Sequence, residues 1–269
     1  MRELNIIKRN NISIEGNLRS SKAIIFANGF GTDQSVWNNV KAKFTNEYKI
    51  ILYDKTGAGT GHPEYYTTER YSTLNGYAED LLEICAALNL RKTYYAGHSV
   101  SGMIGLIAST KDPELFSKLV IIGSSPRYLN APGYTGGFEP EELTKMYHEI
   151  RSNYYNWANG FSKTVTRNED KPLLREGIAH SILSLRPDIA LHAAQAIFES
   201  DYRSLLPQIV HDVLILQTAR DPAVPEDVGL YLKNHIAKSQ LIMIDTEGHF
   251  PHLSAHEEVA DAIKTFIEH

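Results

Sequence analysis

The 269-residue chain contains a single cysteine, no excess of basic residues and no long hydrophobic run. Cys85 cannot form an intramolecular disulfide, which is the cysteine usage expected of a cytoplasmic protein. With 27 Lys and Arg against 32 Asp and Glu, the chain lacks the positive charge that favours nucleic acid or an anionic membrane as a partner. Its apolar runs, such as residues 119–123, are far shorter than the roughly 20 residues that span a bilayer. We therefore expect a cytoplasmic protein that binds neither nucleic acid nor membrane.

Short apolar segments alternate with helical patterns along most of the chain. A hydrophobic content of 42%, with 10% aromatic residues, is ample for a packed core. Strands are predicted at residues 23–27, 49–53, 93–96, 118–122, 213–217 and 241–244. The clearest helical pattern covers residues 73–90, where Cys85 occupies an apolar position and is interpreted as a core residue. This alternation predicts an α/β fold with a mostly parallel sheet and helices on both faces.

The alternation stops between about residues 140 and 202, where no strand is predicted. Helical stretches cover residues 140–157, 171–185 and 187–198 in this region. An all-helical block inserted into an α/β sheet is typical of a cap over the carboxyl edge of the strands, where such folds bind ligands. We therefore expect a core formed by residues 1–132 and 203–269, and a helical cap formed by residues 133–202.

A candidate nucleophile lies in the segment Gly97-His98-Ser99-Val100-Ser101-Gly102. This segment follows a predicted strand and opens a helix predicted over residues 103–109, which is the context of a nucleophile elbow. Ser101 occupies the last position of the usual Gly-x-Ser-x-Gly motif, where it replaces one small residue by another. An ordinary strand-to-helix turn is the alternative interpretation. Ser99 is the candidate nucleophile, and Ser101 is the weaker one because the elbow would place it inside the helix.

A serine hydroxyl needs a positioned base, which a carboxylate must hold in turn. In α/β hydrolysis of this kind the three residues follow in the order serine, acid, histidine. Asp221 follows the strand at 213–217, although an Asp at such a place more commonly caps the next helix. His249 follows the strand at 241–244, and Gly248 lets the backbone turn before it; His252 is the competing base. The order and the loop positions predict a triad of Ser99, Asp221 and His249.

Acyl transfer also requires hydrogen-bond donors for the tetrahedral oxyanion. The turn at residues 28–33 follows the strand at 23–27 and is well placed to supply one donor. The backbone N–H groups of Phe30 and of Val100, the residue after the nucleophile, are the predicted pair. A plain Gly-rich turn is the alternative for the first of them.

No motif for a metal or a cofactor is present. The sequence lacks a Cys/His cluster and a His-Glu-x-x-His motif, so we predict no metal site. Residues 54–61 are Gly-rich, but they lack the Gly-Lys-Ser/Thr ending of a P-loop and do not fit Gly-x-Gly-x-x-Gly. This segment is interpreted as a loop beneath the cap, and no cofactor is expected. Residues 1–9 show no secretory signal.

At these residues the sequence resembles the α/β-hydrolase superfamily, and within it the group that contains bacterial RsbQ and the plant karrikin and strigolactone receptors. The likeness covers nearly the whole chain. It is densest at residues 29–37, 97–101, 113–119, 125–130, 136–139, 186–190, 198–201 and 248–254. The string Gly-Phe-Gly-Thr-Asp-Gln-Ser-Val-Trp at residues 29–37 and the motifs of the cap are far more specific than the Gly-x-Ser element.

The resemblance implies a core sheet of about eight strands with a four-helix V-shaped cap over an apolar pocket. By position it also implies a set of aromatic pocket residues: Phe30, Tyr128, Phe138, Phe161, Phe198 and Phe250. One position departs from the group's pattern. These proteins usually have His-Gly-Phe-Gly, and Asn28 replaces that histidine here. We therefore expect different hydrogen bonds to hold the oxyanion loop.

Two functions follow from the resemblance. The first is a serine hydrolase that acts on a small apolar ester, lactone or butenolide. The second is a signalling protein with the same site but slow turnover, whose partner would be a phosphatase in the RsbQ-like case. In the receptor-like case, a change in cap conformation would recruit the partner. We predict a competent but slow hydrolase with signalling as its biological use.

Overall fold

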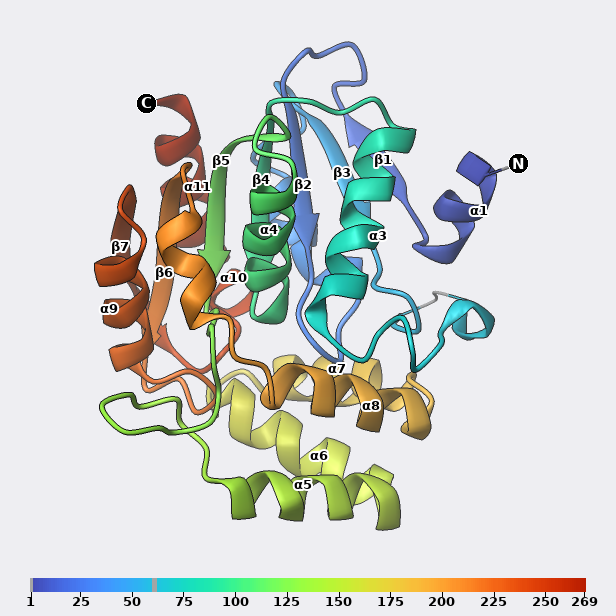
Figure 1. Cartoon of the computed structure of the whole chain (residues 1–269), viewed down its shortest axis with the longest axis vertical. Helices are drawn as coiled ribbons and strands as arrows, with labels where there is room; N and C mark the ends of the chain where they lie inside the picture. Colours follow the sequence, from blue (N-terminus) through green and yellow to red (C-terminus); the bar gives the residue numbers. More distant parts are fainter. Residues whose placement is uncertain (1, 60–61) are drawn as a thin grey trace.

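The computed structural model describes residues 2–59 and 62–269, so the last two residues of the Gly-rich segment 54–61 lie outside the described residues. One mixed sheet runs through the molecule in the strand order β1-β3-β2-β4-β5-β6-β7 (Figure 1). Its strands are β1 (Ser13–Gly16), β2 (Ala23–Ala27), β3 (Lys49–Tyr53), β4 (Thr93–His98), β5 (Phe116–Ile122), β6 (Asp212–Ala219) and β7 (Ser239–Glu247). Only β1 pairs antiparallel with its neighbour, so the predicted mostly parallel sheet is confirmed.

Within the described residues the sheet has seven strands, one fewer than the number that the resemblance implies. The segment ahead of β1 forms a helix, α1 (Arg2–Arg9), and adds no strand. Its apolar residues Ile6 and Ile7 are adjacent and lie between polar and charged residues, so the segment lacks the alternation of a half-buried strand. Arg9 at the end of this helix donates to Glu83 at 2.6 Å, which ties the helix to α3 (Leu74–Ala87).

Helices cover both faces of the sheet, as predicted. One face packs against α3, α4 (Val100–Lys111) and α9 (Glu226–His235); the other packs against α2 (Asn38–Lys41) and α11 (His256–Glu268) (Figure 1). Successive residues of β2 alternate between the two cores, because side chains of a strand point to opposite faces. Ile25 belongs to the first core and Phe26 to the second, and both are fully buried. Cys85 is a buried core residue of α3, as predicted.

Four helices follow β5 and precede β6. They are α5 (Pro140–Ser152), α6 (Tyr154–Thr166), α7 (Pro172–Leu183) and α8 (Pro187–Phe198), called here the helical insertion. The single helical stretch expected at 140–157 is two helices, because Asn153 ends α5 and its side chain accepts from the backbone N–H of Asn156 to cap α6. The insertion lies across the end of the sheet to which the arrowheads of β2 and β5 point (Figure 1).

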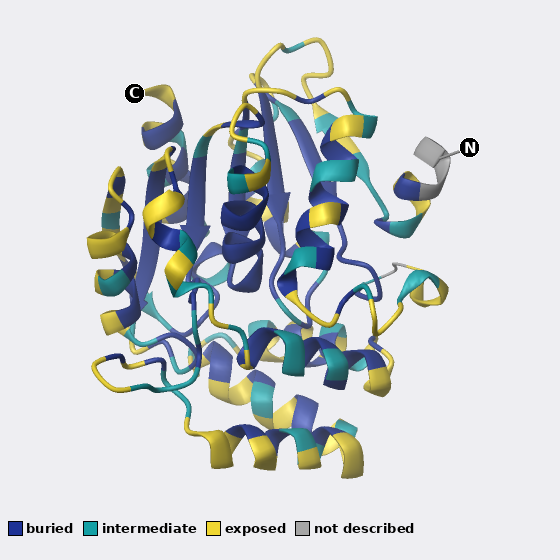
Figure 2. Cartoon of the chain, in the orientation of Figure 1, coloured by how far each residue is buried: buried dark blue, intermediate teal, exposed yellow. Residues whose placement is uncertain are grey.

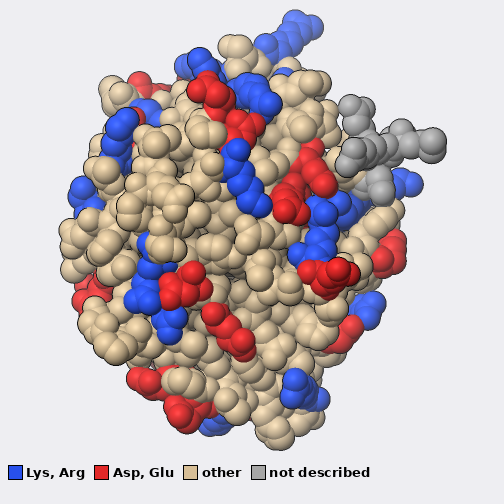
Figure 3. All heavy atoms as spheres, in the orientation of Figure 1, with Lys and Arg blue, Asp and Glu red and all other residues tan. Residues whose placement is uncertain are grey.

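The surface of the molecule is mixed in charge, and its interior is apolar. In Figure 2 the strands of the sheet are buried, whereas the outward side of α5 is exposed. On the face drawn in Figure 3, lysine and arginine side chains lie among acidic ones and form no continuous basic stripe. None of the helices in the described part of the chain is long and apolar enough to cross a membrane.

Candidate active site

Ser99 lies in a strained turn between β4 and α4. Its φ of 56° and ψ of −127° place it in the positive-φ region, which a residue with a side chain rarely adopts. The surrounding glycines are needed for close packing: a Cβ on Gly102 would lie 2.0 Å from Ser124 Oγ, and one on Gly97 would lie 2.6 Å from the carbonyl oxygen of Ser101. This geometry is that of a nucleophile elbow. Ser101 lies within the first turn of α4.

A continuous chain of hydrogen bonds joins the three predicted triad residues. His249 Nε2 lies 2.8 Å from Ser99 Oγ, and His249 Nδ1 lies 2.8 Å from Asp221 Oδ2. All three residues are buried, with exposed fractions of 6% each. Because a carboxylate only accepts hydrogen bonds, Asp221 fixes the proton on Nδ1 and leaves the Nε2 lone pair facing the serine hydroxyl. The arrangement allows His249 to take the proton of Ser99.

The alternatives for the acid and the base do not fit this geometry. Helix α9 begins at Glu226 with Pro225 as its N-cap, so Asp221 does not cap it. The Oδ1 atom of Asp221 instead accepts from the backbone N–H groups of Ala223 and Val224, at 2.8 and 3.1 Å. His252 is fully buried and stacks on a tryptophan ring with centroids 4.7 Å apart, and burial lowers its pKa to about 3. It therefore stays neutral inside the core.

The loop that carries His249 is held from two sides. Nε2 of His98 donates to the backbone carbonyl of His249 at 2.7 Å, and burial holds the pKa of His98 well below its usual range. On the other side, the N–H of His249 donates to the carbonyl of Val165, near the end of α6, at 2.8 Å. The backbone of the base is therefore bonded both to the nucleophile elbow and to the helical insertion. Sequence reasoning missed these two contacts, although His98 stands directly before Ser99.

The two predicted oxyanion donors come from different segments. Phe30 lies in the turn after β2, and Val100 is the first residue of α4. Neither backbone N–H has a hydrogen-bond acceptor within residues 2–59 and 62–269. The first N–H groups of a helix have no partner inside it, so the Val100 N–H is available to a negatively charged oxygen beside Ser99.

A small apolar cavity lies over Ser99 and His249. Its volume is about 20 Å³, room for about one water molecule. Predicted pocket residues that line it are Phe30, Tyr128, Phe161, Phe198 and Phe250. Phe138 does not line it: its ring packs on that of Phe198 at 5.3 Å between centroids, and it borders a groove beside α6. Sequence reasoning missed Ile197 and Ala223, which also line the cavity and carry no aromatic signal.

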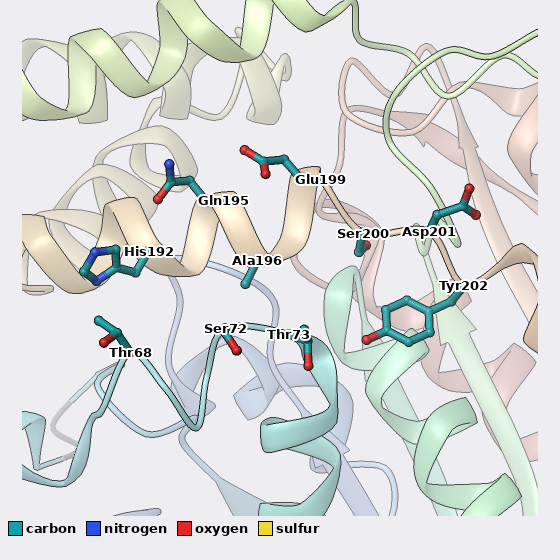
Figure 4. Close-up of a pocket in the computed structure, with 10 residues that line it drawn as sticks. All are labelled: Thr68, Ser72, Thr73, His192, Gln195, Ala196, Glu199, Ser200, Asp201 and Tyr202. Atoms are coloured by element: carbon teal, nitrogen blue, oxygen red, sulfur yellow. The ribbon is translucent and has the colours of Figure 1, made fainter.

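A larger hollow lies elsewhere, between α8 and the segment that leads into α3 (Figure 4). It has a volume of about 600 Å³, and His192, Gln195 and Glu199 of α8 face Thr68, Ser72 and Thr73 across it. Its lining includes none of Ser99, Asp221 and His249. Among the described residues no group of three or more His, Cys, Asp or Glu side chains is arranged to hold a metal ion.

Comparison with known proteins agrees with the fold and the elbow. A family model described as the alpha/beta hydrolase fold matches residues 22–255. The chain belongs to the α/β-hydrolase family. This confirms the superfamily that the sequence motifs indicated.

Close relatives in this family include plant proteins. The chain is 43% identical over 256 residues to "Strigolactone esterase RMS3" of Pisum sativum, covering 94% of this chain and 95% of that protein. It is 41% identical over 260 residues to "Karrikin insensitive 2 receptor CA" of Petunia hybrida, covering 96% of both. Among solved structures, a hydrolase from Oleispira antarctica has a TM-score of 0.94 and 36% identity, covering 99% of this chain and 97% of that one. The expected likeness to the plant receptors within the α/β-hydrolase family is thus confirmed.

Proposed function

We propose that this α/β-hydrolase cleaves a small apolar ester, lactone or butenolide with Ser99, His249 and Asp221 as its catalytic triad. The observation that carries this proposal is the chain of two 2.8 Å hydrogen bonds from Asp221 through His249 to Ser99. Relatives named as strigolactone esterases support an ester-hydrolysing function.

The proposed reaction has two stages. Ser99 Oγ attacks the carbonyl carbon while His249 Nε2 takes the hydroxyl proton, and the N–H groups of Phe30 and Val100 stabilise the oxyanion. The carbon–oxygen bond to the leaving group then breaks, and His249 returns the proton to the departing oxygen. Water, deprotonated by His249, releases the acyl group from Ser99.

The substrate class follows from the cavity. Its lining is dominated by aromatic rings, which favour apolar molecules with few polar groups. A volume of about 20 Å³ is too small for an ester of several carbons, so the substrate enters only when the helical insertion moves away from the sheet. Residues 133–202 therefore act in this proposal as a cap on a core formed by residues 1–132 and 203–269. Such a movement is a reason to expect slow turnover.

The test is a rapid-mixing measurement with a small fluorogenic aryl ester, with the Ser99→Ala variant in parallel. Sustained hydrolysis that the variant lacks supports an esterase or lactonase. A burst of about one equivalent followed by near-standstill supports acylation with slow release. Equal rates in the variant and the wild type would contradict the proposal.

A signalling role is the second candidate, and one contact favours it. The N–H of His249 donates to Val165 of the insertion, so covalent chemistry at the site can be coupled to the position of α6. A relative named as a karrikin insensitive receptor supports this reading, and an RsbQ-like partner would be a phosphatase-type protein. Hydrogen exchange in α5–α8, measured during the acyl-enzyme burst and in Ser99→Ala, tests it. Exchange that does not change on acylation contradicts the coupling.

A further inference from the structure

Lys55 is a buried lysine next to the oxyanion loop. It follows β3 in sequence, and it is only 7% exposed. Its Nζ donates to the backbone carbonyl of Asn28 and, at 2.9 Å, to that of Gly29. It has no side-chain carboxylate as a hydrogen-bond partner among the described residues, so its ammonium group is spent on the two carbonyls that precede Phe30.

The second of these carbonyls belongs to the peptide that carries an oxyanion donor. The C=O of Gly29 and the N–H of Phe30 are the two ends of one planar peptide unit. A cation that hydrogen-bonds the oxygen draws electrons from the nitrogen and makes its N–H a stronger donor, and hydrogen bonds in such a chain strengthen one another. It also fixes the plane of the peptide and hence the direction of the N–H.

We propose that Lys55 is a positioning residue for hydrolysis, which holds and polarises the Phe30 N–H through the carbonyl of Gly29. The proposal rests on the proposed function, because it assigns Lys55 to the oxyanion step of that reaction. It also accounts for Asn28 at the position where similar proteins have histidine.

The remaining hydrogen bonds of the loop are neutral. The side-chain amide of Asn28 donates to the carbonyl of Thr32, and Thr32 Oγ1 donates to the carbonyl of Gly29 at 3.1 Å. Ser101 Oγ donates to the carbonyl of Asn28 at 2.5 Å. Lys55 is therefore the one charged donor on these two carbonyls within the described part of the chain. A charged donor contributes about twice as much as a neutral one.

The charge on Lys55 responds to pH near neutrality. Burial lowers the pKa of Lys55 to about 7, against the opposing effect of the neighbouring Asp54. Other titratable groups around it are His98, whose own pKa Lys55 helps to lower, and Tyr77, which lines the same cavity. Since the ammonium form is the polarising one, oxyanion stabilisation weakens as pH rises through this pKa.

The decisive variant is Lys55→Met, which keeps the length of the side chain and removes its donor and charge. Loss of a whole oxyanion donor lowers kcat by about 10²–10³-fold, so loss of its support should lower kcat/KM for an aryl ester by about 10- to 100-fold. The matched control is Lys118→Met. Lys118 also donates to a backbone carbonyl, that of Phe266 at 2.9 Å, but lies on β5 against α11. The control should hydrolyse the ester as the wild type does.

The pH profile separates positioning from mere stability. In the wild type kcat/KM should fall to a lower plateau as pH rises past about 7, and in Lys55→Met this alkaline fall should be absent. Should that variant not fold, the wild-type chain alone decides. Its Phe30 amide resonance in ¹⁵N spectra should shift with the titration of the Lys55 amine.

Either of two results would overturn the role of Lys55. They are a Lys55→Met variant within twofold of the wild type with an unchanged pH profile, or a Phe30 amide that does not move as Lys55 titrates. Failure of the proposed function is a different result, because Ser99→Ala would then hydrolyse the ester as fast as the wild type.

Discussion

Replacement of Asp221 by asparagine tests the triad most sharply, because the structure fixes how the new amide would lie. Oδ1 of Asp221 accepts from two backbone N–H groups at 2.8 and 3.1 Å. An amide oxygen can keep both bonds and an amide NH₂ cannot, so the NH₂ group of Asp221→Asn must point at His249 Nδ1. Nδ1 then accepts instead of donating, and the imidazole proton moves to Nε2. His249 would present a proton to Ser99 where a lone pair is needed.

The size of the effect follows from the lost base. The wrong imidazole tautomer in a serine triad lowers kcat by about 10⁴-fold. This corresponds to about 5 kcal/mol of transition-state stabilisation, since each factor of ten is about 1.4 kcal/mol. Because the Asp221 side chain is only 1% exposed, water cannot easily replace the missing acceptor, and we expect a loss of at least 10³-fold.

The assay is the burst rate of a fluorogenic aryl ester on rapid mixing, with urea unfolding to show that the variant is folded. Asp212→Asn is the matched control, because Asp212 is an exposed residue at the opposite end of the same strand, β6. It should leave the burst rate unchanged. A folded Asp221→Asn variant that loses less than about tenfold would refute the tautomer argument.

Three further perturbations have expected outcomes. Asp80 is buried and pairs with two arginines at 3.0 and 2.6 Å, so Asp80→Ala should lower the free energy of unfolding in urea by about 3 kcal/mol. An unchanged urea midpoint would contradict this. Burial keeps the pKa of His98 well below its usual range and lowers that of His252 to about 3. The unfolded chain therefore binds more protons below about pH 6.5, and stability should fall on acidification by about 1.4 kcal/mol per pH unit for each histidine, with a shallower slope in His252→Phe. Gly248 has a φ of +82°, and a Cβ there would lie 2.3 Å from the carbonyl oxygen of Thr166. Gly248→Ala should therefore lower the melting temperature and the burst rate together, and loss of neither would show that the loop tolerates the shift.

Much of the core could be predicted because its strands are short and continuously apolar. The bounds predicted for β2 and β3 match the structure, since their buried runs end at polar residues. The prediction for β7 was too short. This strand lies at the edge of the sheet, where Ile242 and Met243 are 38% and 43% exposed and polar residues continue the pairing. The break between α5 and α6 was missed because Asn153 interrupts an otherwise continuous aromatic pattern.

The sequence by itself determined the order of the functional residues. Ser99, Asp221 and His249 each follow a strand, and parallel strands bring their carboxyl ends to one edge of a sheet. Local pattern and topology therefore predicted which side chains meet.

Only the tertiary structure decided what supports them. Lys55 meets the oxyanion loop from a different strand, and His98 holds the backbone of a residue 151 positions away. The small size of the cavity likewise depends on how the rings of Phe30 and Phe198, from the core and the insertion, pack edge to face. Such contacts depend on distances between segments that are remote in sequence, and no local propensity or spacing records them, because folding sets them only when the whole core is packed.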